Sequence, residues 1–237
     1  MSGHSKWSTI KRQKEANDQA KGKVFSKLVN AISVAVKTGG GVDPETNHKL
    51  RMAIDSAKAA NMPKQNIDRA IENAGRSGEI LEEVMYEGFG PEGVGILVEA
   101  ATDNRNRTGA EIRNIFEKRG GNLGTPGSVS FNFEKQGFLL IQKESDVETQ
   151  MLSLMDFDLL DLKEADDGIE IYVHANKLYE TKTDLEKQGY NVSKAELVQV
   201  PKTTLNISKE ASLKLTGLLE ALEDHDDVQK VFVNAEL

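Results

Sequence analysis

The spacing of apolar residues changes near Ser77, and this change most constrains how the 237-residue chain can fold. Before that point, apolar side chains recur at every third or fourth position, which is the period of a helix with one buried face. After it, apolar runs of strand length alternate with helical stretches. The sequence therefore predicts an α+β protein that begins with helices and continues with mixed helix and sheet.

An N-terminal domain of three helices is predicted for residues 1–78. Residues 25–36, 50–57 and 67–74 each carry a helical apolar stripe, and glycines or Pro63 separate them. A DNA-binding helix-turn-helix motif needs three or four residues between two helices. Residues 39–46 are too long a connection for that motif, and Asn61-Met62 is only marginally compatible with it.

The rest of the chain predicts two ferredoxin-like βαββαβ domains, the second inserted in the first. The first comprises residues 79–136 plus 200–237, with strands at 94–100, 129–133, 204–207 and 231–233. Its helices start at Thr108, which with Glu111 forms a capping-box pattern, and near Leu215. The inserted domain, residues 137–199, has strands at 138–142, 159–163, 169–173 and 195–200 and helices at 147–155 and 178–188.

Charge divides the chain at nearly the same place. Residues 1–76 hold 14 Lys/Arg and 7 Asp/Glu, a net charge of +7, whereas residues 77–237 hold 16 and 31, a net charge of −15. An acidic body repels phosphate, so nucleic acid should contact mainly the first 76 residues. The inserted domain has 6 Lys/Arg and 14 Asp/Glu, which suits a protein partner or solubility better than nucleic acid.

Residues 1–27, here called the basic arm, are the leading candidate for a nucleic-acid-binding segment. The arm holds the only Trp of the chain, Trp7, and between Lys11 and Lys23 its apolar side chains are limited to Ala16 and Ala20. Such a segment has little to bury, and its charge suits a polyanion. A solvated first helix is the alternative. The residues predicted to neutralise phosphates are Lys6, Lys11, Arg12, Lys14, Lys21, Lys23 and Lys27, with Trp7 packing on a base or sugar.

Two further stretches are weaker candidates for nucleic acid contact. Arg105 and Arg107 lie in a predicted loop before a helix, where guanidinium groups and helix amides could hold a phosphate. An ordinary exposed loop is equally compatible with the pattern. Phe131 and Phe133 share a predicted strand face with Val129, as aromatics do in RNA-recognition domains. Core packing explains them better, because the sequence pattern of those domains is missing.

No catalytic, metal or cofactor site is predicted. The four histidines are scattered without metal-ligand spacing, and the acidic residues around His225 suggest a solvated loop. Residues 88–93 match G-x-G-x-x-G, but a strand comes directly after them, so a turn is expected instead of a nucleotide site. Residues 120–128 are rich in glycine and lack the spacing of a phosphate-binding loop. The absence of cysteine, signal peptide and membrane span favours a cytoplasmic protein.

Five separated motifs resemble those of the YebC/PmpR family, in the same order and over nearly the whole chain. They are Gly3-His4-Ser5-Lys6-Trp7, Lys58-Ala59-Ala60-Asn61-Met62-Pro63-Lys64, Tyr86-Glu87-Gly88-Phe89-Gly90-Pro91, Thr102-Asp103-Asn104-Arg105-Asn106-Arg107-Thr108 and Gly120-Gly121-Asn122-Leu123-Gly124. The resemblance implies a three-domain plan with an inserted domain, and a non-enzymatic regulator without a cofactor. Residues 156–167 resemble the family least.

The same resemblance implies two different nucleic acid partners. Bacterial members are described as probable transcriptional regulators that bind DNA. Mitochondrial relatives are translational activators of cytochrome c oxidase, and some bacterial members relieve ribosomes stalled at proline runs. The leading hypothesis is thus a DNA-binding transcriptional regulator, and the alternative is a ribosome-associated translation factor that binds ribosomal or transfer RNA. A more remote alternative is a protein-interaction module whose acidic domains dock a partner protein.

Overall fold

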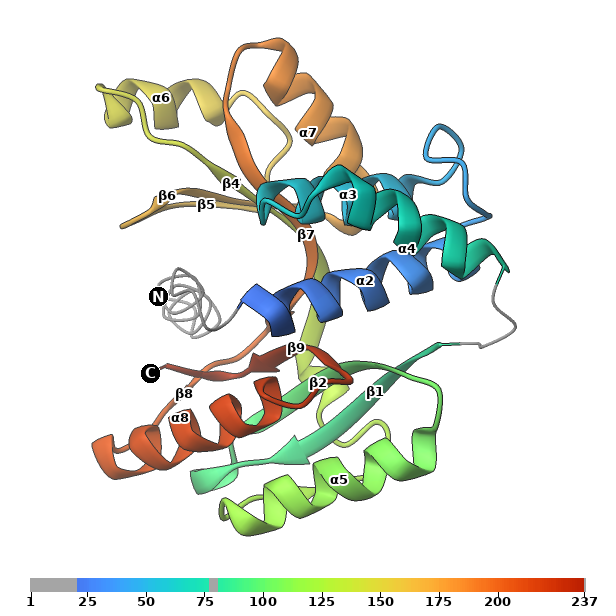
Figure 1. The fold of residues 1–237 in the computed structure, drawn as a ribbon. Coiled ribbons are helices and arrows are strands. Elements are labelled where there is room, and N and C mark those ends of the chain that lie inside the picture. The colour runs from blue at the N-terminus through green and yellow to red at the C-terminus, as the bar shows by residue number, and fades with distance from the viewer. Residues whose placement is uncertain (1–20, 77–80, 237) are drawn as a thin grey trace. The chain divides into compact units, whose positions relative to one another are not determined.

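The computed structural model describes residues 21–76 and 81–236, apart from the side chain of Lys21. These residues fall into two compact units: the first runs up to Glu134 and resumes at Val200, and the second is Lys135–Gln199. In the first unit, a group of helices comes first in the chain, and a sheet covered by further helices comes after it. The second unit consists of a sheet and its own helices (Figure 1). The predicted α+β class, with helices first and one unit inserted in another, is confirmed.

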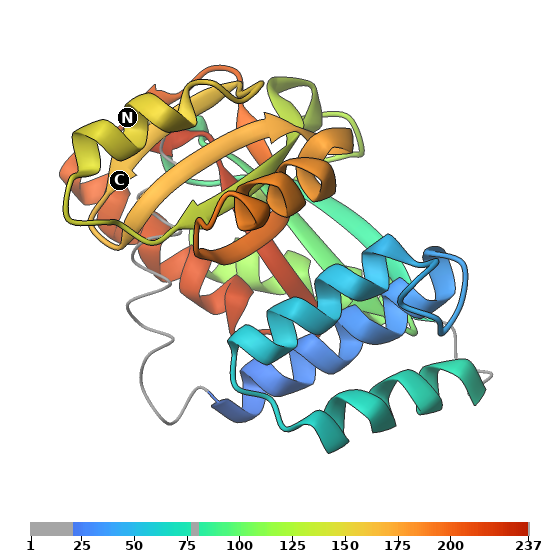
Figure 2. The same cartoon turned by 90° about the horizontal axis from the view of Figure 1, so that it is seen from above.

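From Lys21 onward, where the described residues begin, the first unit has the helices α2 (Lys21–Thr38), α3 (His48–Ala59) and α4 (Lys64–Arg76). Their apolar faces share one core, in which Ile32, Leu50 and Ile67 are at most 3% exposed. Helix α2 lies between α3 and α4 and packs against both, while α3 and α4 touch each other only slightly (Figure 2). The predicted helices are confirmed. They form a bundle around α2, unlike the two mutually packed helices of a helix-turn-helix motif.

Asn47 joins the end of α2 to the start of α3, and its side chain is fully buried. As the N-cap of α3, its Oδ1 accepts a hydrogen bond from the Leu50 N–H at 2.9 Å. Its Nδ2 donates to the carbonyl oxygens of Ala35 and Gly41 at 2.8 and 2.7 Å. A Cβ at Gly39 would collide with this amide, so the turn after α2 requires glycine there.

We expect Asn47→Ala to lower the free energy of unfolding by about 2–3 kcal/mol, because it removes a helix cap and leaves buried backbone groups without their partner. Denaturant unfolding followed by circular dichroism measures this loss. Asn73→Ala, on the exposed side of α4, is the matched control and should change stability by less than about 0.5 kcal/mol. Equal losses in the two variants would contradict the capping role.

The sheet of the first unit has the strand order β3-β1-β2-β9, and β1 and β9 both run antiparallel to β2. Its strands are β1 (Glu82–Phe89), β2 (Gly95–Thr102), β3 (Asn122–Leu123) and β9 (Val228–Val233). Helices α5 (Arg105–Lys118) and α8 (Lys209–Glu223) pack on one face through Ile112, Phe116, Leu215 and Leu219. The short strands β8 (Leu205–Asn206) and β10 (Ala235–Glu236) form a separate parallel pair.

Two local predictions for this unit miss features near α5. Strand β1 is not predicted, because the buried carboxylate of Glu87 interrupts its apolar pattern. Helix α5 begins at Arg105, and its cap is Asn104, whose Oδ1 accepts a hydrogen bond from the Arg107 N–H at 3.1 Å. Thr108, the predicted cap, lies buried in the first turn instead.

A third local prediction, a strand at residues 129–133, is also wrong. The chain forms a short 3-10 helix, Ser130–Asn132, and strand β4 starts only at Phe133. Alternation of apolar residues imitates a strand here, but the turn leaves Phe131 71% exposed while Val129 and Phe133 are buried. The prediction that these side chains pack in the core is therefore wrong for Phe131 and correct for Val129 and Phe133.

The second unit is ferredoxin-like. Its chain runs through β4 (Phe133–Ile141), α6 (Val147–Leu154), β5 (Asp161–Ala165), β6 (Gly168–His174), α7 (Leu178–Lys187) and β7 (Val192–Pro201). The strand order β5-β6-β4-β7 places the first and third strands of the unit at its centre, as in a βαββαβ fold. The predicted strands and helices of this unit are all confirmed, and its hairpin turns between Ala165 and Gly168.

Hydrogen bonds hold together the two chain ends of the first unit that flank the insertion. The Asn132 carbonyl accepts a hydrogen bond from the Lys202 N–H at 2.8 Å, and Asn132 Nδ2 donates to the Thr203 carbonyl at 3.1 Å. Lys202 Nζ donates to the Phe131 carbonyl at 3.0 Å. Within the second unit, β4 and β7, which carry the chain in and out, are neighbouring strands.

Candidate nucleic-acid interface

The structure describes only part of the predicted interface. Lys6, Trp7, Lys11, Arg12 and Lys14 lie outside the described residues. Lys21 is the first residue of α2, and its side chain is not described. The remaining four residues form two groups: Lys23 and Lys27 lie in the first turns of α2, and Arg105 and Arg107 lie in the first turn of α5.

Lys23 and Lys27 contact the C-terminal end of α8. Lys23 Nζ lies 3.3 Å from both the carbonyl oxygen and Oδ1 of Asp224. Lys27 Nζ donates to the Glu223 carbonyl at 2.5 Å. The last carbonyls of a helix carry partial negative charge, so these two lysines stabilise the end of α8. Lys23 keeps 55% of its side chain exposed and remains available to a phosphate, whereas Lys27 is partly buried.

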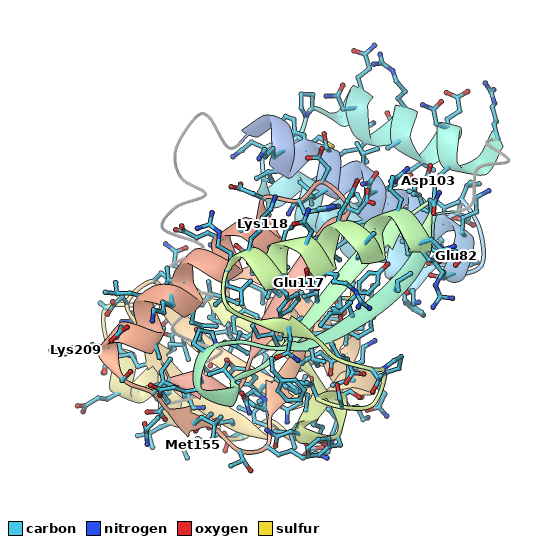
Figure 3. All side chains as sticks on the ribbon, turned by 90° about the horizontal axis from the view of Figure 1, so that it is seen from below. Glu82, Asp103, Glu117, Lys118, Met155 and Lys209 are labelled. Atoms are coloured by element: carbon cyan, nitrogen blue, oxygen red, sulfur yellow. The ribbon has the colours of Figure 1, made fainter. Side chains whose placement is uncertain are left out.

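Both predicted arginines of α5 lie beside carboxylates. Arg107 Nη2 donates to Asp103 Oδ1 at 2.7 Å and to Asp227 Oδ2 at 3.3 Å. Arg105 Nε lies 3.9 Å from Glu82 Oε2, and its side chain is 67% exposed. Figure 3 shows Glu82 and Asp103 at the same end of α5. A phosphate at this end would compete with these carboxylates for the arginines. Arg107 is held by its carboxylates more tightly than Arg105 and is therefore less available to a phosphate.

Asp227 is the centre of a hydrogen-bonded cluster that fixes the start of α5. Its Oδ2 accepts a hydrogen bond from Thr108 Oγ1 at 2.5 Å, and Thr108 Oγ1 lies 2.7 Å from Thr102 Oγ1. Partial burial alone would raise the pKa of Asp227, but hydrogen bonds from Thr108, Arg107 and Thr102 hold that pKa below its ordinary value. The Asp227 carboxylate is therefore stabilised in its ionised form, hydrogen-bonded to these side chains.

The structure also brings together Glu111, His225 and Asp227, whose side-chain ligand atoms lie within 4.8 Å of one another. The His225 Nδ1 accepts a hydrogen bond from the Asp227 N–H at 3.1 Å, so a neutral ring carries its proton on Nε2 and donates to Glu111 Oε2 at 2.8 Å. A metal ion at this ring would need the Nε2 lone pair, and the neighbouring Arg107 would repel it. The geometry favours a structural cluster.

The glycine-rich loop after α5 binds a carboxylate of the protein itself. The Glu87 carboxylate accepts hydrogen bonds from the backbone N–H groups of Gly127, Val129 and Ser130 at 2.8, 2.6 and 2.8 Å. Burial alone would raise the pKa of Glu87, but these three hydrogen bonds hold it below its ordinary value. The N–H groups that could have bound a phosphate are thus satisfied internally. The predicted turn lies between β1 and β2 and comprises residues 90–94, whereas Gly88 and Phe89 still pair with β2 as the end of β1.

Three cations near the connection between α3 and α4 extend the candidate interface. Lys58 lies in the last turn of α3, Lys64 is the first residue of α4, and Arg69 lies on the exposed side of α4. All three are exposed, and within residues 21–76 and 81–236 their side chains have no hydrogen-bond or ion-pair partner. No pattern in the sequence distinguishes them from other surface cations.

Comparison with known proteins identifies the family. Residues 5–77 match the model of the TACO1/YebC protein N-terminal domain, and residues 81–235 match that of the TACO1/YebC second and third domain. The chain belongs to the TACO1/YebC family. The resemblance seen in the five sequence motifs is therefore confirmed, and the two matches separate the helical part of this TACO1/YebC protein from the rest.

Relatives of this TACO1/YebC protein are similar over their whole length. Proteins from Persephonella marina and Thermoanaerobacter pseudethanolicus are 48% and 46% identical to it, cover all of this chain and are themselves covered to 96% and 98%. Both are named probable transcriptional regulatory proteins. The crystal structure of a conserved hypothetical protein from Aquifex aeolicus matches with a TM-score of 0.87 at 44% identity, over 92% of this chain and 91% of that one. None of the helices in the described part of the chain is long and apolar enough to span a bilayer.

Proposed function

We propose that this TACO1/YebC protein is a non-enzymatic regulator of gene expression that binds nucleic acid through its basic arm and the helices after it. The observation that carries the proposal is the separation of charge, +7 in residues 1–76 against −15 in the remainder. The exposed Lys58, Lys64 and Arg69 add cations on the same part of the chain. The names of the relatives support a regulatory role. The absence of cysteine fits a reducing compartment such as the cytoplasm.

Duplex DNA is the first candidate ligand, and the protein would then regulate transcription. Lysine and arginine side chains would neutralise phosphates of the backbone, which gives affinity with little sequence preference. Ribosomal or transfer RNA is the second candidate, and the protein would then act in translation. Trp7 favours RNA, because an indole ring can stack on unpaired bases, which an intact duplex does not offer.

Crosslinking in native lysate distinguishes the two candidates. A tagged copy would be irradiated at near-physiological salt, and the nucleic acid attached to it would be sequenced. Discrete DNA segments upstream of genes would establish transcriptional control, whereas enrichment of ribosomal or transfer RNA would establish a translation factor. The control is a variant in which Lys6, Lys11, Arg12 and Lys14 are replaced by Gln. If the wild type and this variant crosslinked to the same nucleic acid in equal amounts, binding through the basic arm would be contradicted.

Trp7→Ala tests the RNA candidate. If Trp7 stacks on an unpaired base, the substitution should cost about 1–3 kcal/mol of binding free energy for a single-stranded RNA. Fluorescence anisotropy with a labelled RNA hairpin and a labelled DNA duplex would measure both affinities. Unchanged affinity for the RNA would show that the ring does not stack on a base.

Replacing Lys58, Lys64 and Arg69 together by Gln tests whether the exposed cations of α3 and α4 reach phosphate. Each phosphate contact contributes about −0.9 to the slope of log affinity against log salt concentration, so the slope should become shallower by about 1 if these cations supply the one contact of roughly five that the basic arm does not make. The matched control replaces Arg113, Lys118 and Lys209, which are exposed cations of the first unit outside α2, α3 and α4. Equal slopes for the two triple variants would exclude a specific role of the α3–α4 surface.

A further inference from the structure

The inserted unit has three large exposed apolar side chains close together in sequence, here called the apolar patch. Leu152 and Met155 are each 67% exposed and Leu160 is 41% exposed. These three residues lie within one stretch of nine residues, whereas the other large exposed apolar side chains of the described residues, Val42, Phe131 and Leu213, are far apart in sequence. Single exposed apolar residues are ordinary, but a cluster of large ones typically marks an interaction site.

The patch is built on ordered elements. Leu152 lies in the last turn of α6 and Met155, labelled in Figure 3, is its C-cap, so the two side chains lie three positions apart on one face of the helix. The next turn is held by Phe157, whose ring packs edge-on against Tyr190 at 6.4 Å between centroids. Leu160 is fixed to the sheet, because its N–H donates to the Tyr172 carbonyl at 2.8 Å.

Negative charge surrounds this patch. Glu148, in the first turn of α6, and Asp156, directly after Met155, are both exposed, and in the part of the chain that the structure describes neither carboxylate forms an ion pair. Nearby lysines are already paired: Lys143 with Glu164, Lys163 with Asp161 and Lys177 with Glu180. The last carbonyls of α6 add partial negative charge at Met155. Residues 135–199 carry 7 Lys/Arg and 14 Asp/Glu, so the unit repels phosphate.

We propose that the patch formed by Leu152, Met155 and Leu160 docks a basic amphipathic segment of another protein. Apolar side chains of that segment would cover the three exposed residues, and its Lys or Arg side chains would pair with Glu148 and Asp156. Both nucleic acid and an anionic bilayer carry the wrong charge for this surface. The inference extends the proposed function, since the inserted unit brings a protein partner to a regulator whose basic arm binds nucleic acid.

The test uses the full chain and two short labelled peptides in fluorescence anisotropy. One peptide is an amphipathic helix of Lys and Leu, and the other has the same length and charge with Ser in place of Leu. We expect the Lys/Leu peptide to bind and the Lys/Ser peptide to bind at least about tenfold more weakly. L152S/M155S and E148K/D156K should each weaken binding of the Lys/Leu peptide by at least about tenfold.

Matched controls separate the patch from general effects of charge and exposure. Leu213→Ser removes a 77% exposed leucine of the first unit, and Glu117→Lys reverses an exposed charge on α5. Both should leave peptide affinity within about twofold of the wild type. Equal affinity of L152S/M155S and the wild type, or equal binding of the two peptides, would overturn the proposal. So would binding of neutral phosphatidylcholine vesicles in place of the peptide.

The two proposals fail separately. Nucleic acid affinity of L152S/M155S, measured with the same labelled RNA hairpin and DNA duplex, should equal that of the wild type. Loss of nucleic acid binding in this variant would place the patch in the nucleic acid interface and overturn docking of a protein. Failure of the wild type to bind nucleic acid would overturn the proposed function and leave the peptide result standing.

Discussion

Glu87→Gln is expected to lower the free energy of unfolding by about 3–5 kcal/mol, the largest loss predicted for a single residue of this protein. Glu87 is 6% exposed and accepts three hydrogen bonds from the loop between α5 and β4. A neutral amide weakens all three, and its NH2 group would face N–H groups that also donate. At least one buried N–H would lose its acceptor, and the loop would lose the carboxylate around which it folds.

The same variant should reveal a characteristic dependence on pH. Because the pKa of Glu87 is lower in the folded protein than in the unfolded chain, its charge stabilises the fold above the unfolded value of about 4.3. That contribution is lost as pH falls from there through the folded-state pKa. The stability difference between wild type and Glu87→Gln should therefore be full at neutral pH and shrink in acid.

Urea unfolding at neutral pH and at a series of acidic values measures both effects. Glu117→Gln, at an exposed position of α5, serves as the control and should change the free energy of unfolding by less than about 0.5 kcal/mol throughout. A stability difference for Glu87→Gln that stays constant as the pH falls would show that the loop does not depend on the ionised carboxylate.

Salt should control nucleic acid binding strongly. If the protein neutralises roughly five phosphates, a fourfold rise in salt concentration should weaken binding to a DNA duplex by about 10² to 10³. Replacing Lys6, Lys11, Arg12 and Lys14 by Gln should reduce that loss to only about threefold to fourfold, because about one phosphate contact would remain. Lys23 and Lys27 stay unchanged in this variant, since they also bind the end of α8.

Fluorescence anisotropy of a labelled duplex over a series of salt concentrations measures the two slopes. The variant in which Arg113, Lys118 and Lys209 are replaced by Gln controls for total charge and should retain nearly the slope of the wild type. A wild-type affinity that does not respond to salt would rule out binding through phosphate neutralisation.

The second unit is the part of the fold that the sequence predicts best. Its strands are bounded by clear turn residues, such as those between Ala165 and Gly168, and each of its helices buries one face, with Leu154 in α6 and Leu178 and Leu185 in α7. The first unit is predicted less well, because its sheet depends on a buried carboxylate. Glu87 interrupts the apolar pattern of β1, and the loop that it binds contains the turn that leaves Phe131 exposed. The spacing of apolar residues reflects contacts within one helix or strand, so it cannot reveal the contact between Glu87 and a distant loop or the exposure of Phe131 that results.

The candidate interface, too, could be predicted only in part, because contacts between residues far apart in sequence decide which cations are available. Charge composition indicates the basic arm and the helices after it, but which cations are already paired depends on distant residues. Arg107 binds Asp227, 120 positions away, and Lys23 binds Asp224, 201 positions away. Spacing along one sequence contains no sign of these pairs. Lys58, Lys64 and Arg69 become candidates only because the structure shows them exposed and unpaired among the described residues.

The hydrogen bonds among Phe131, Asn132, Lys202 and Thr203 have a consequence for how this family can diversify. They close the host chain just outside the second unit, whose first and last strands are neighbours. The cost of closing a loop grows only slowly with its length, so sequence between these ends can be lengthened, shortened or exchanged with little effect on the host. The inserted unit can therefore behave as an interchangeable cassette, free to acquire new partners while the rest of the chain stays the same.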